Sequence, residues 1–412
     1  MTTPLTLAHL TQAVATGAAI RLRRRLQPAG GPGDKVFPPT YEGGTYAVEP
    51  RVIEGKETTC ILLDSVQSQA NRMELALLAA HRNGRISIPV IGVDFGADDL
   101  GEIGWVTSLD APHRIADAIL RDSMVDGKKF REHPAGKCLE TATPAKAGDL
   151  FGWCPTALVF GLWDSTGPRG GLGTKFQRAL VSEIVAVGAS IDNRKPASRI
   201  DPLNISAVLY ETESGEWTVD KTEAKTEKGK PVLYKKDGKP SVINHGNVTP
   251  ALDHDDKKSK KRVPNHGGTT MQYALQSTVM SLPAIRRLSF TANAADSNLT
   301  GQTALAALGL CAAALSVDLG CDLRSRCLLV PEGAATWELI QADGTATPWA
   351  LSGADAEQLL GEAVSAAKAK GLPWLAKDKA HALDLRPSPG LAALVKKSRE
   401  LSVSTTSDSD EG

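Results

Sequence analysis

The segment that most constrains the fold is residues 303–319, which are rich in alanine and leucine and carry one charge, at Asp318. A helix that is apolar on every side has to be surrounded by protein or by lipid. The segment falls short of the roughly 18 uninterrupted apolar residues that mark a membrane span. We therefore expect no membrane span but a helix buried inside a folded domain. The 42% apolar content of the 412 residues is enough to bury it.

The order of the other predicted elements sets the fold class. Strands and helices follow one another without regular β-α alternation, which favours an α+β fold over a doubly wound sheet. A helix should begin at Asp64 or Ser65 and run to about His81, because a capping side chain there precedes apolar positions at helical spacing. A second helix should begin at Asp110. The main strands are expected at residues 20–25, 58–63, 86–95 and 157–163.

Composition changes along the chain and suggests its division. Residues 211–265 are rich in Lys, Glu, Asp and Gly and poor in large apolar residues, so we predict a charged insertion that is flexible in part. The main domain would then comprise residues 1–210 and 266–400. Residues 401–412 are acidic and serine-rich and are predicted to form a disordered tail.

Charge and cysteine usage exclude several classes of protein. The 47 basic residues equal the 47 acidic ones, so a polyanion must be held by a local basic patch. The six cysteines form no Cys-x-x-Cys pair, which predicts reduced thiols in the cytoplasm and no zinc site. No signal peptide is expected at the N-terminus. His254-Asp255 resembles a metal-binding dipeptide, but the lysines beside it favour a solvated loop. We therefore predict no metal and no cofactor.

Residues 64–72, Asp-Ser-Val-Gln-Ser-Gln-Ala-Asn-Arg, place hydroxyl, amide and guanidinium groups at the start of a helix. Free backbone N–H groups and the positive end of the helix dipole lie at the same place. Together they would bind phosphate oxygens without reading base identity. The same pattern also fits a capped helix start that faces only solvent.

A second candidate combines the basic run Arg21–Arg25 with Lys35 and with Phe37 and Tyr41 on a glycine-rich loop. Basic and aromatic side chains together suit single-stranded nucleic acid, through charge neutralisation and base stacking. The alternation around Leu22 predicts a strand with one basic face. A solvated edge strand remains an equal alternative.

Two further places could contact phosphate. The loop 167–175 is glycine-rich but lacks the order of a nucleotide-binding loop, so an ATPase site is not expected. Arg169, Lys175 and Arg178 could still lie along a phosphate chain, although an ordinary turn fits as well. His113-Arg114 could contact phosphate or form a polar first helical turn.

Four blocks in this order resemble a known family: residues 33–41 (GDKVFPPTY), 62–72 (LLDSVQSQANR), 111–123 (APHRIADAILRDS) and 178–184 (RALVSEI). They look like the RAMP-superfamily Cas-seven backbone subunit of type I-G CRISPR systems, formerly type I-U. The resemblance spans most of residues 20–345. It implies an RRM-like, ferredoxin-like palm in which large insertions form fingers and a thumb.

The resemblance also implies a function. Such subunits polymerise along a CRISPR RNA in a Cascade complex and present it for pairing with target DNA, so base pairing reads the sequence. The implied partners are guide RNA, target DNA through the guide, other copies of the chain and other Cascade subunits. The RNA-binding residues we predict are Arg21, Arg23, Arg24, Arg25, Lys35, Phe37, Ser65, Gln67, Ser68, Gln69, Asn71, Arg72, His113, Arg114, Arg169, Lys175 and Arg178.

We expect a protein without catalytic residues, because no motif supplies a nucleophile with its base. The rival hypothesis is a CRISPR RNA-processing endoribonuclease that uses His113 or His266 as general acid and base.

Overall fold

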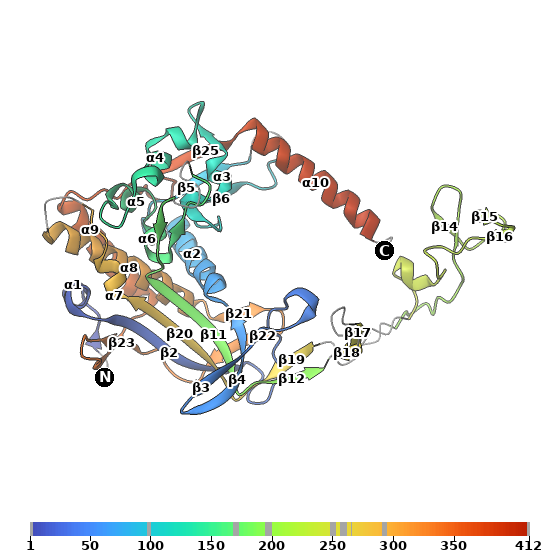
Figure 1. Ribbon diagram of the computed structural model, residues 1–412, viewed down its shortest axis with the longest axis horizontal. Helices are drawn as coiled ribbons and strands as arrows, with labels where there is room; N and C mark the ends of the chain where they lie inside the picture. Colours follow the sequence, from blue (N-terminus) through green and yellow to red (C-terminus); the bar gives the residue numbers. More distant parts are fainter. Residues whose placement is uncertain are drawn as a thin grey trace. The chain divides into compact units, whose positions relative to one another are not determined.

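The computed structural model describes residues 3–96, 100–167, 173–193, 200–247, 253–255, 262–264, 266–290 and 295–409 (Figure 1). The chain forms two compact units, each described by itself below. Unit 1 comprises Met1–Ser190 and Thr269–Ala393, and unit 2 comprises Ile191–Gly268 and Leu394–Gly412. Residues 191–210, which the composition assigned to the main domain, thus group with unit 2. The predicted Arg169 lies outside the described residues.

A large, mainly antiparallel sheet is the centre of unit 1. Among the strands that the structure describes in this sheet, only the short pair of β1 with β24 is parallel. Across the sheet the order is β1 (Thr3–Pro4), β24 (Ala346–Ala350), β23 (Trp337–Ile340), β2 (Ala19–Pro28), β20 (Tyr273–Ser281), β11 (Leu180–Val187), β4 (Lys56–Asp64) and β3 (Val48–Ile53). The hairpin of β21 (Cys321–Arg324) and β22 (Cys327–Pro331) adds to the far end of β2.

Helices pack on one face of this sheet. Figure 1 shows α2 (Val66–Arg82) and α8 (Ala295–Asp318) on the same side of β2, β20 and β11. In β20, alternate residues from Ala274 to Met280 are buried toward the helices, and those between them are only half-buried. The predicted α+β class is confirmed. An antiparallel sheet with helices on one face is the arrangement that an RRM-like palm requires.

The helix predicted from residues 303–319 lies in the core. Every residue from 304 to 314 is buried. By length and composition α8 could cross a membrane, but 83% of its most apolar window is buried inside the protein, as in the core helix of a globular domain. It packs against α1 (Leu7–Thr16), α2, α6 (Pro155–Phe160), α7 (Leu282–Arg286) and α9 (Gly353–Ala369). All six cysteines are buried free thiols.

The rest of unit 1 contains a smaller sheet and several short helices. That sheet has the order β6 (Trp105–Thr107), β5 (Ile91–Asp94), β25 (Leu383–Pro387), β7 (Ser123–Val125) and β8 (Lys128–Lys129). The short helices are α3 (Ala118–Arg121), α4 (Pro134–Thr141) and α5 (Gly148–Trp153), and the hairpin of β9 (Leu162–Trp163) and β10 (Lys175–Phe176) follows α6.

Three sequence-based elements were wrong in type or extent. Residues 157–163 are not a strand, because helix α6 continues to Phe160 and only β9 is extended. The strand expected at 86–95 is limited to β5. No helix begins at Asp110, whose carboxylate instead accepts hydrogen bonds from Thr107. Positive φ at Arg114 interrupts the chain, and Asp117 caps the short α3 instead.

Unit 2 consists of short hairpins and turns. A hairpin around Ser214-Gly215 pairs β13 (Tyr210–Glu211) with β14 (Trp217–Thr218). The other strands are β12 (Ser190–Asn193), β15 (Thr226–Glu227), β16 (Lys230–Pro231), β17 (Asp253–Asp255), β18 (Arg262–Pro264) and β19 (His266–Thr270). A 3-10 helix at Pro240–Ile243 follows the turn at Asp237-Gly238. Helix α10 (Pro389–Ser409) continues through most of the tail that was predicted to be disordered.

Candidate nucleic-acid interface

The first turns of α2 have an inner face that bonds to the protein itself. Asp64, which ends β4, is fully buried, and it accepts hydrogen bonds from Ser68 Oγ at 2.8 Å and Gln69 Nε2 at 2.6 Å. Arg72 Nε and Arg324 Nη2 reach the same carboxylate at 3.0 and 3.3 Å. Ser65 is the N-cap and accepts from the backbone N–H of Ser68. Buried carboxylates need such partners, so this cluster stabilises the strand–helix junction.

Gln69 extends this network into the sheet. Its side-chain carbonyl accepts from Ser182 Oγ at 2.9 Å and from Gln276 Nε2 at 3.0 Å. Gln276 in turn accepts from the guanidinium of Arg24. Gln69 and Arg24 are both buried, which corrects their prediction as RNA contacts. Their polar groups hold α2 on β2, β11 and β20.

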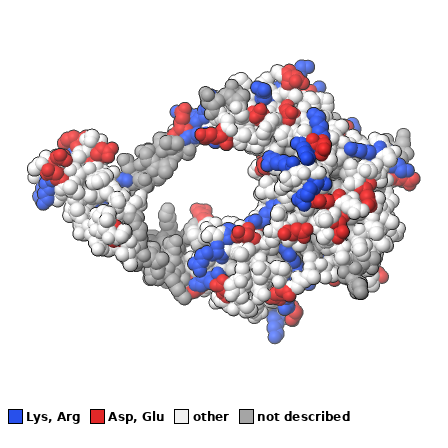
Figure 2. Space-filling model, turned by 180° about the vertical axis from the view of Figure 1, so that it is seen from behind, with Lys and Arg blue, Asp and Glu red and all other residues white. Residues whose placement is uncertain are grey.

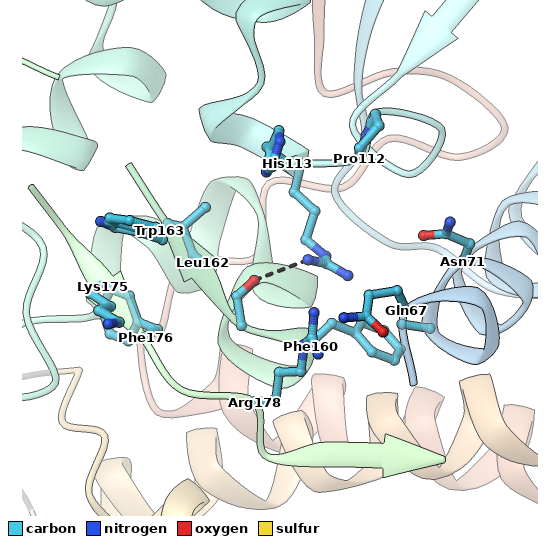
Figure 3. A pocket seen from close by; sticks show the side chains of 13 residues that line it. Gln67, Asn71, Pro112, His113, Phe160, Leu162, Trp163, Lys175, Phe176 and Arg178 are labelled. Atoms are coloured by element: carbon cyan, nitrogen blue, oxygen red, sulfur yellow. Dashed lines mark hydrogen bonds between the residues drawn. The ribbon is translucent and has the colours of Figure 1, made fainter. Parts of the chain in front are cut away.

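The outer face of α2 carries Gln67 and Asn71, whose side chains are exposed. Both line a cavity of about 410 Å³, which we call the Trp163 pocket. Figure 3 shows these two residues on one side of the pocket, with Leu162, Trp163 and Lys175 on the other. The lining residues are Gln67, Ala70, Asn71, Pro112, His113, Arg114, Phe160, Gly161, Leu162, Trp163, Lys175, Phe176 and Arg178.

An exposed aromatic ring forms the second wall of the Trp163 pocket. Trp163 is 53% exposed, and Lys175, opposite it in the β9–β10 ladder, holds its Nζ 5.3 Å from the ring centroid. The next residue, Asp164, is buried and makes two 2.7 Å hydrogen bonds with Arg131, which fixes the end of β9. Arg178 is exposed at the same cavity. A ring and two cations can bind a base together with its phosphates.

Arg114 supports the wall of the pocket. Its guanidinium makes a two-point ion pair with Glu74, at 2.6 and 2.8 Å, and donates to the carbonyl of Gly161 at 3.0 Å. The pair is buried, and burial raises the pKa of Glu74 to about 7 although Arg114 opposes the shift. The prediction of Arg114 as a free phosphate contact is therefore corrected. His113 beside it is exposed to the pocket.

The β2 arginines divide between the two faces of the sheet. Side chains alternate between the two faces of a sheet along a strand. Arg24 therefore points to one face, and the other face carries Arg21, Arg23 and Arg25. Arg21 pairs with Glu338 at 2.6 Å. Arg25 lies over the ring of Tyr273, 4.1 Å from its centroid. Lys35 and Phe37 do not line the Trp163 pocket. The guanidinium carbon of Arg326 lies over the Phe37 ring, 4.4 Å from its centroid.

Six of the predicted residues thus meet at the Trp163 pocket: Gln67, Asn71, His113, Arg114, Lys175 and Arg178. Sequence reasoning missed Trp163, because the apolar run before it was interpreted as one buried strand. A tryptophan next to Asp164 and a glycine-rich loop was the signal available. In the space-filling view, basic and acidic residues are interspersed over the visible face (Figure 2).

Within the described part of the chain, no group of three or more His, Cys, Asp or Glu side chains could hold a metal ion.

One comparison with known proteins matches part of the chain to a CRISPR-associated family. Residues 20–191 match the family model described as CRISPR-associated protein GSU0053. The matched segment is less than half of the chain, and it contains every residue that lines the Trp163 pocket. No curated protein matches the sequence.

Among solved structures, the chain is similar to the crystal structure of Thermofilum pendens Csc2. The identity is 12%, over 90% of this chain and 82% of that chain, with a TM-score of 0.26. A score this low does not define a shared fold.

Proposed function

We propose that this protein is a backbone subunit of a type I CRISPR Cascade complex, of subtype I-G, that binds guide RNA without cleaving it. Copies would assemble along one CRISPR RNA in the cytoplasm, with other Cascade subunits, and present it for pairing with target DNA. The CRISPR-associated family match over residues 20–191 supports a role of this kind. The sequence of the target would be read by base pairing, and the protein would hold backbone and shape.

One observation carries the proposal. Residues from three separated segments, each predicted from its chemistry or family resemblance to contact RNA, line one cavity with an exposed tryptophan. The pocket provides amides at Gln67 and Asn71 and cations at Lys175 and Arg178. Neutral amides can bind phosphate oxygens without distinguishing bases, and the cations supply the electrostatic attraction.

The test measures binding of a repeat-containing CRISPR RNA by fluorescence anisotropy at several salt concentrations. The double variant Lys175→Ala/Arg178→Ala should bind at least about ten-fold more weakly. Its logarithmic salt slope should become shallower by about 1.4, that is about 0.7 for each lost phosphate contact on a single strand. Lys128→Ala/Lys129→Ala is the matched control, because both lysines are exposed in β8, outside the pocket. Equal binding by both double variants would contradict the proposal.

His113 motivates the second candidate function, an RNA-processing endoribonuclease, because its imidazole is exposed in the same pocket. Labelled repeat RNA incubated with the protein, with and without magnesium, separates the two functions. We expect intact RNA and binding that increases with RNA length. Cleavage at a specific site that is lost in His113→Ala would establish the enzyme instead.

A further inference from the structure

The helix-free face of the central sheet carries a groove that is distinct from the Trp163 pocket. Two cavities of about 470 and 610 Å³ join there, since both are lined by Arg25, Ile53, Glu54 and Tyr273. Arg23 and Leu275 line the first, and Lys56 lines the second. We call the joined cavities the β2 groove. Its edge is the β3–β4 turn, where Glu54 and Gly55 have positive φ.

Apolar side chains form part of the lining of the β2 groove. Ile53, Tyr273 and Leu275 line it, and together with Leu62 they pack on a small buried cluster of Cys60, Val185 and Val187. Strands β3, β4, β11 and β20 contribute these side chains. An apolar lining of this kind can accept the face of a base or another flat group.

The charges of the groove differ from those around it. On the same face, Arg21 is neutralised by Glu338, and Arg51 is neutralised by Glu49 and Glu183. Within the groove, Arg23 and Lys56 are exposed and form no ion pair with any described residue. Arg25 stacks on Tyr273 and pairs with no carboxylate in the described ranges. Among the described residues that line the two cavities, Glu54 is the only acidic one, so the groove keeps a net positive charge.

The groove and the Trp163 pocket lie on opposite faces of the sheet. Arg24 and Gln276 turn toward α2 through Gln69, whereas Arg23, Arg25 and Tyr273 alternate with them and face away. Gln67 and Asn71 lie beyond α2 on the helix side. One nucleotide therefore cannot contact both sites, because the full thickness of the sheet and a helix separates them.

We propose that the β2 groove is a second binding site, for single-stranded nucleic acid. Arg23 and Lys56 contact phosphates, and a base stacks on the outer plane of the Arg25 guanidinium, whose inner plane lies on Tyr273. Bases stack on arginine planes and aromatic rings in single-strand recognition. An acidic peptide could pair with the cations, but it has no base to stack on Arg25 and Tyr273. The site depends on the groove alone and does not require RNA in the Trp163 pocket.

The experiment uses the full-length Lys175→Ala/Arg178→Ala protein, in which the Trp163 pocket is weakened, with fluorescein-labelled oligo-dT and oligo-U as probes. Adding Arg23→Ala/Arg25→Ala should weaken probe binding about ten-fold and flatten the salt slope by about 0.7, for the one phosphate contact that Arg23 makes. Arg21→Ala is the matched control and should change binding less than about two-fold, because Glu338 already neutralises Arg21. Circular dichroism confirms that each variant is folded. The tighter of the two probes identifies DNA or RNA as the preferred strand.

Two results would overturn the second site. The first is equal probe binding with and without Arg23 and Arg25. The second is loss of self-association in Arg23→Ala/Arg25→Ala, measured by sedimentation, with probe affinity unchanged, since the groove would then bind another copy. Failure of guide RNA binding in the wild type would instead contradict only the proposed function.

Discussion

The inner and outer faces of α2 carry similar side chains and use them differently. On the inner face, Ser68, Gln69 and Arg72 are bonded to buried Asp64. On the outer face, Gln67 and Asn71 are exposed and line the Trp163 pocket. The comparison shows that hydrogen-bonding capacity alone does not make a binding site. A polar side chain is available to a ligand only where the fold has not already provided its partner.

The largest expected effect concerns the inner face. Asp64→Ala should lower the free energy of unfolding by about 3–5 kcal/mol, because Arg72 and Arg324 lose their buried carboxylate. Urea denaturation measures the loss. Gln67→Ala, one turn away on the outer face, should change stability by less than about 0.5 kcal/mol. Equal stability of the two variants would remove the distinction between the faces.

Local patterns predicted the α2 region well. The strand, the Ser65 cap and the helix follow from a few adjacent residues, and the buried helix at 303–319 follows from its uniform composition. The burial of Gln69 and its hydrogen-bond partners could not be predicted from adjacent residues. Its partners Ser182 and Gln276 lie 113 and 207 residues away, so only the register of β11 and β20 brings them to α2.

Nonlocal contacts also explain what the sequence could not show about the pocket. Trp163 is exposed for two reasons. Gly161 turns the chain at positive φ, and Arg131, 33 residues earlier in the chain, donates hydrogen bonds to the carboxylate of Asp164. The predicted helix at Asp110 failed because Arg114 is held by Glu74 and by the carbonyl of Gly161, 40 and 47 residues away. Three of the four blocks that carry the family resemblance contribute residues to the Trp163 pocket, and the tertiary contacts decide which of their side chains face it.

The next largest effect concerns the wall opposite α2. Trp163→Ala should weaken binding of CRISPR RNA by about 1–3 kcal/mol, the usual contribution of one stacked base. Trp163→Phe should recover most of the affinity, because the aromatic face is kept. Equilibrium anisotropy titrations provide the comparison, and thermal unfolding should be nearly unchanged, since half of the ring is already in solvent. Equal affinities of the Ala variant and the wild type would exclude stacking on Trp163.

A pH effect is expected from Glu74. Because burial raises its pKa to about 7, the folded protein binds this proton more tightly than the unfolded chain. Its stabilising contribution is full below the ordinary carboxyl pKa and is lost as the pH rises through about 7. Between pH 6 and 8 the wild type should lose about 1.4 kcal/mol of stability relative to Glu74→Gln.

The same proton should change the pocket. At lower pH, Glu74 is protonated and no longer neutralises the positive charge of Arg114. The RNA affinity of the wild type should therefore rise as the pH falls, whereas the affinity of Glu74→Gln should change less with pH. His113→Asn is measured alongside, because its imidazole lines the same cavity. A pH dependence that survives in Glu74→Gln but disappears in His113→Asn would assign the effect to the imidazole.

The smallest effect tests the two faces of α2 directly. Asn71→Ala should weaken RNA binding by about 0.5–1 kcal/mol, the net contribution of one neutral hydrogen bond, and leave stability unchanged. Gln69→Ala should do the reverse, because the buried side-chain N–H of Gln276 loses its acceptor and Ser182 keeps only its bond with Thr278, at a cost of about 1–3 kcal/mol in stability. The division between the inner and outer faces is supported only if Asn71→Ala lowers RNA affinity and Gln69→Ala lowers stability. If the helix were one continuous phosphate site, both variants would lose RNA affinity.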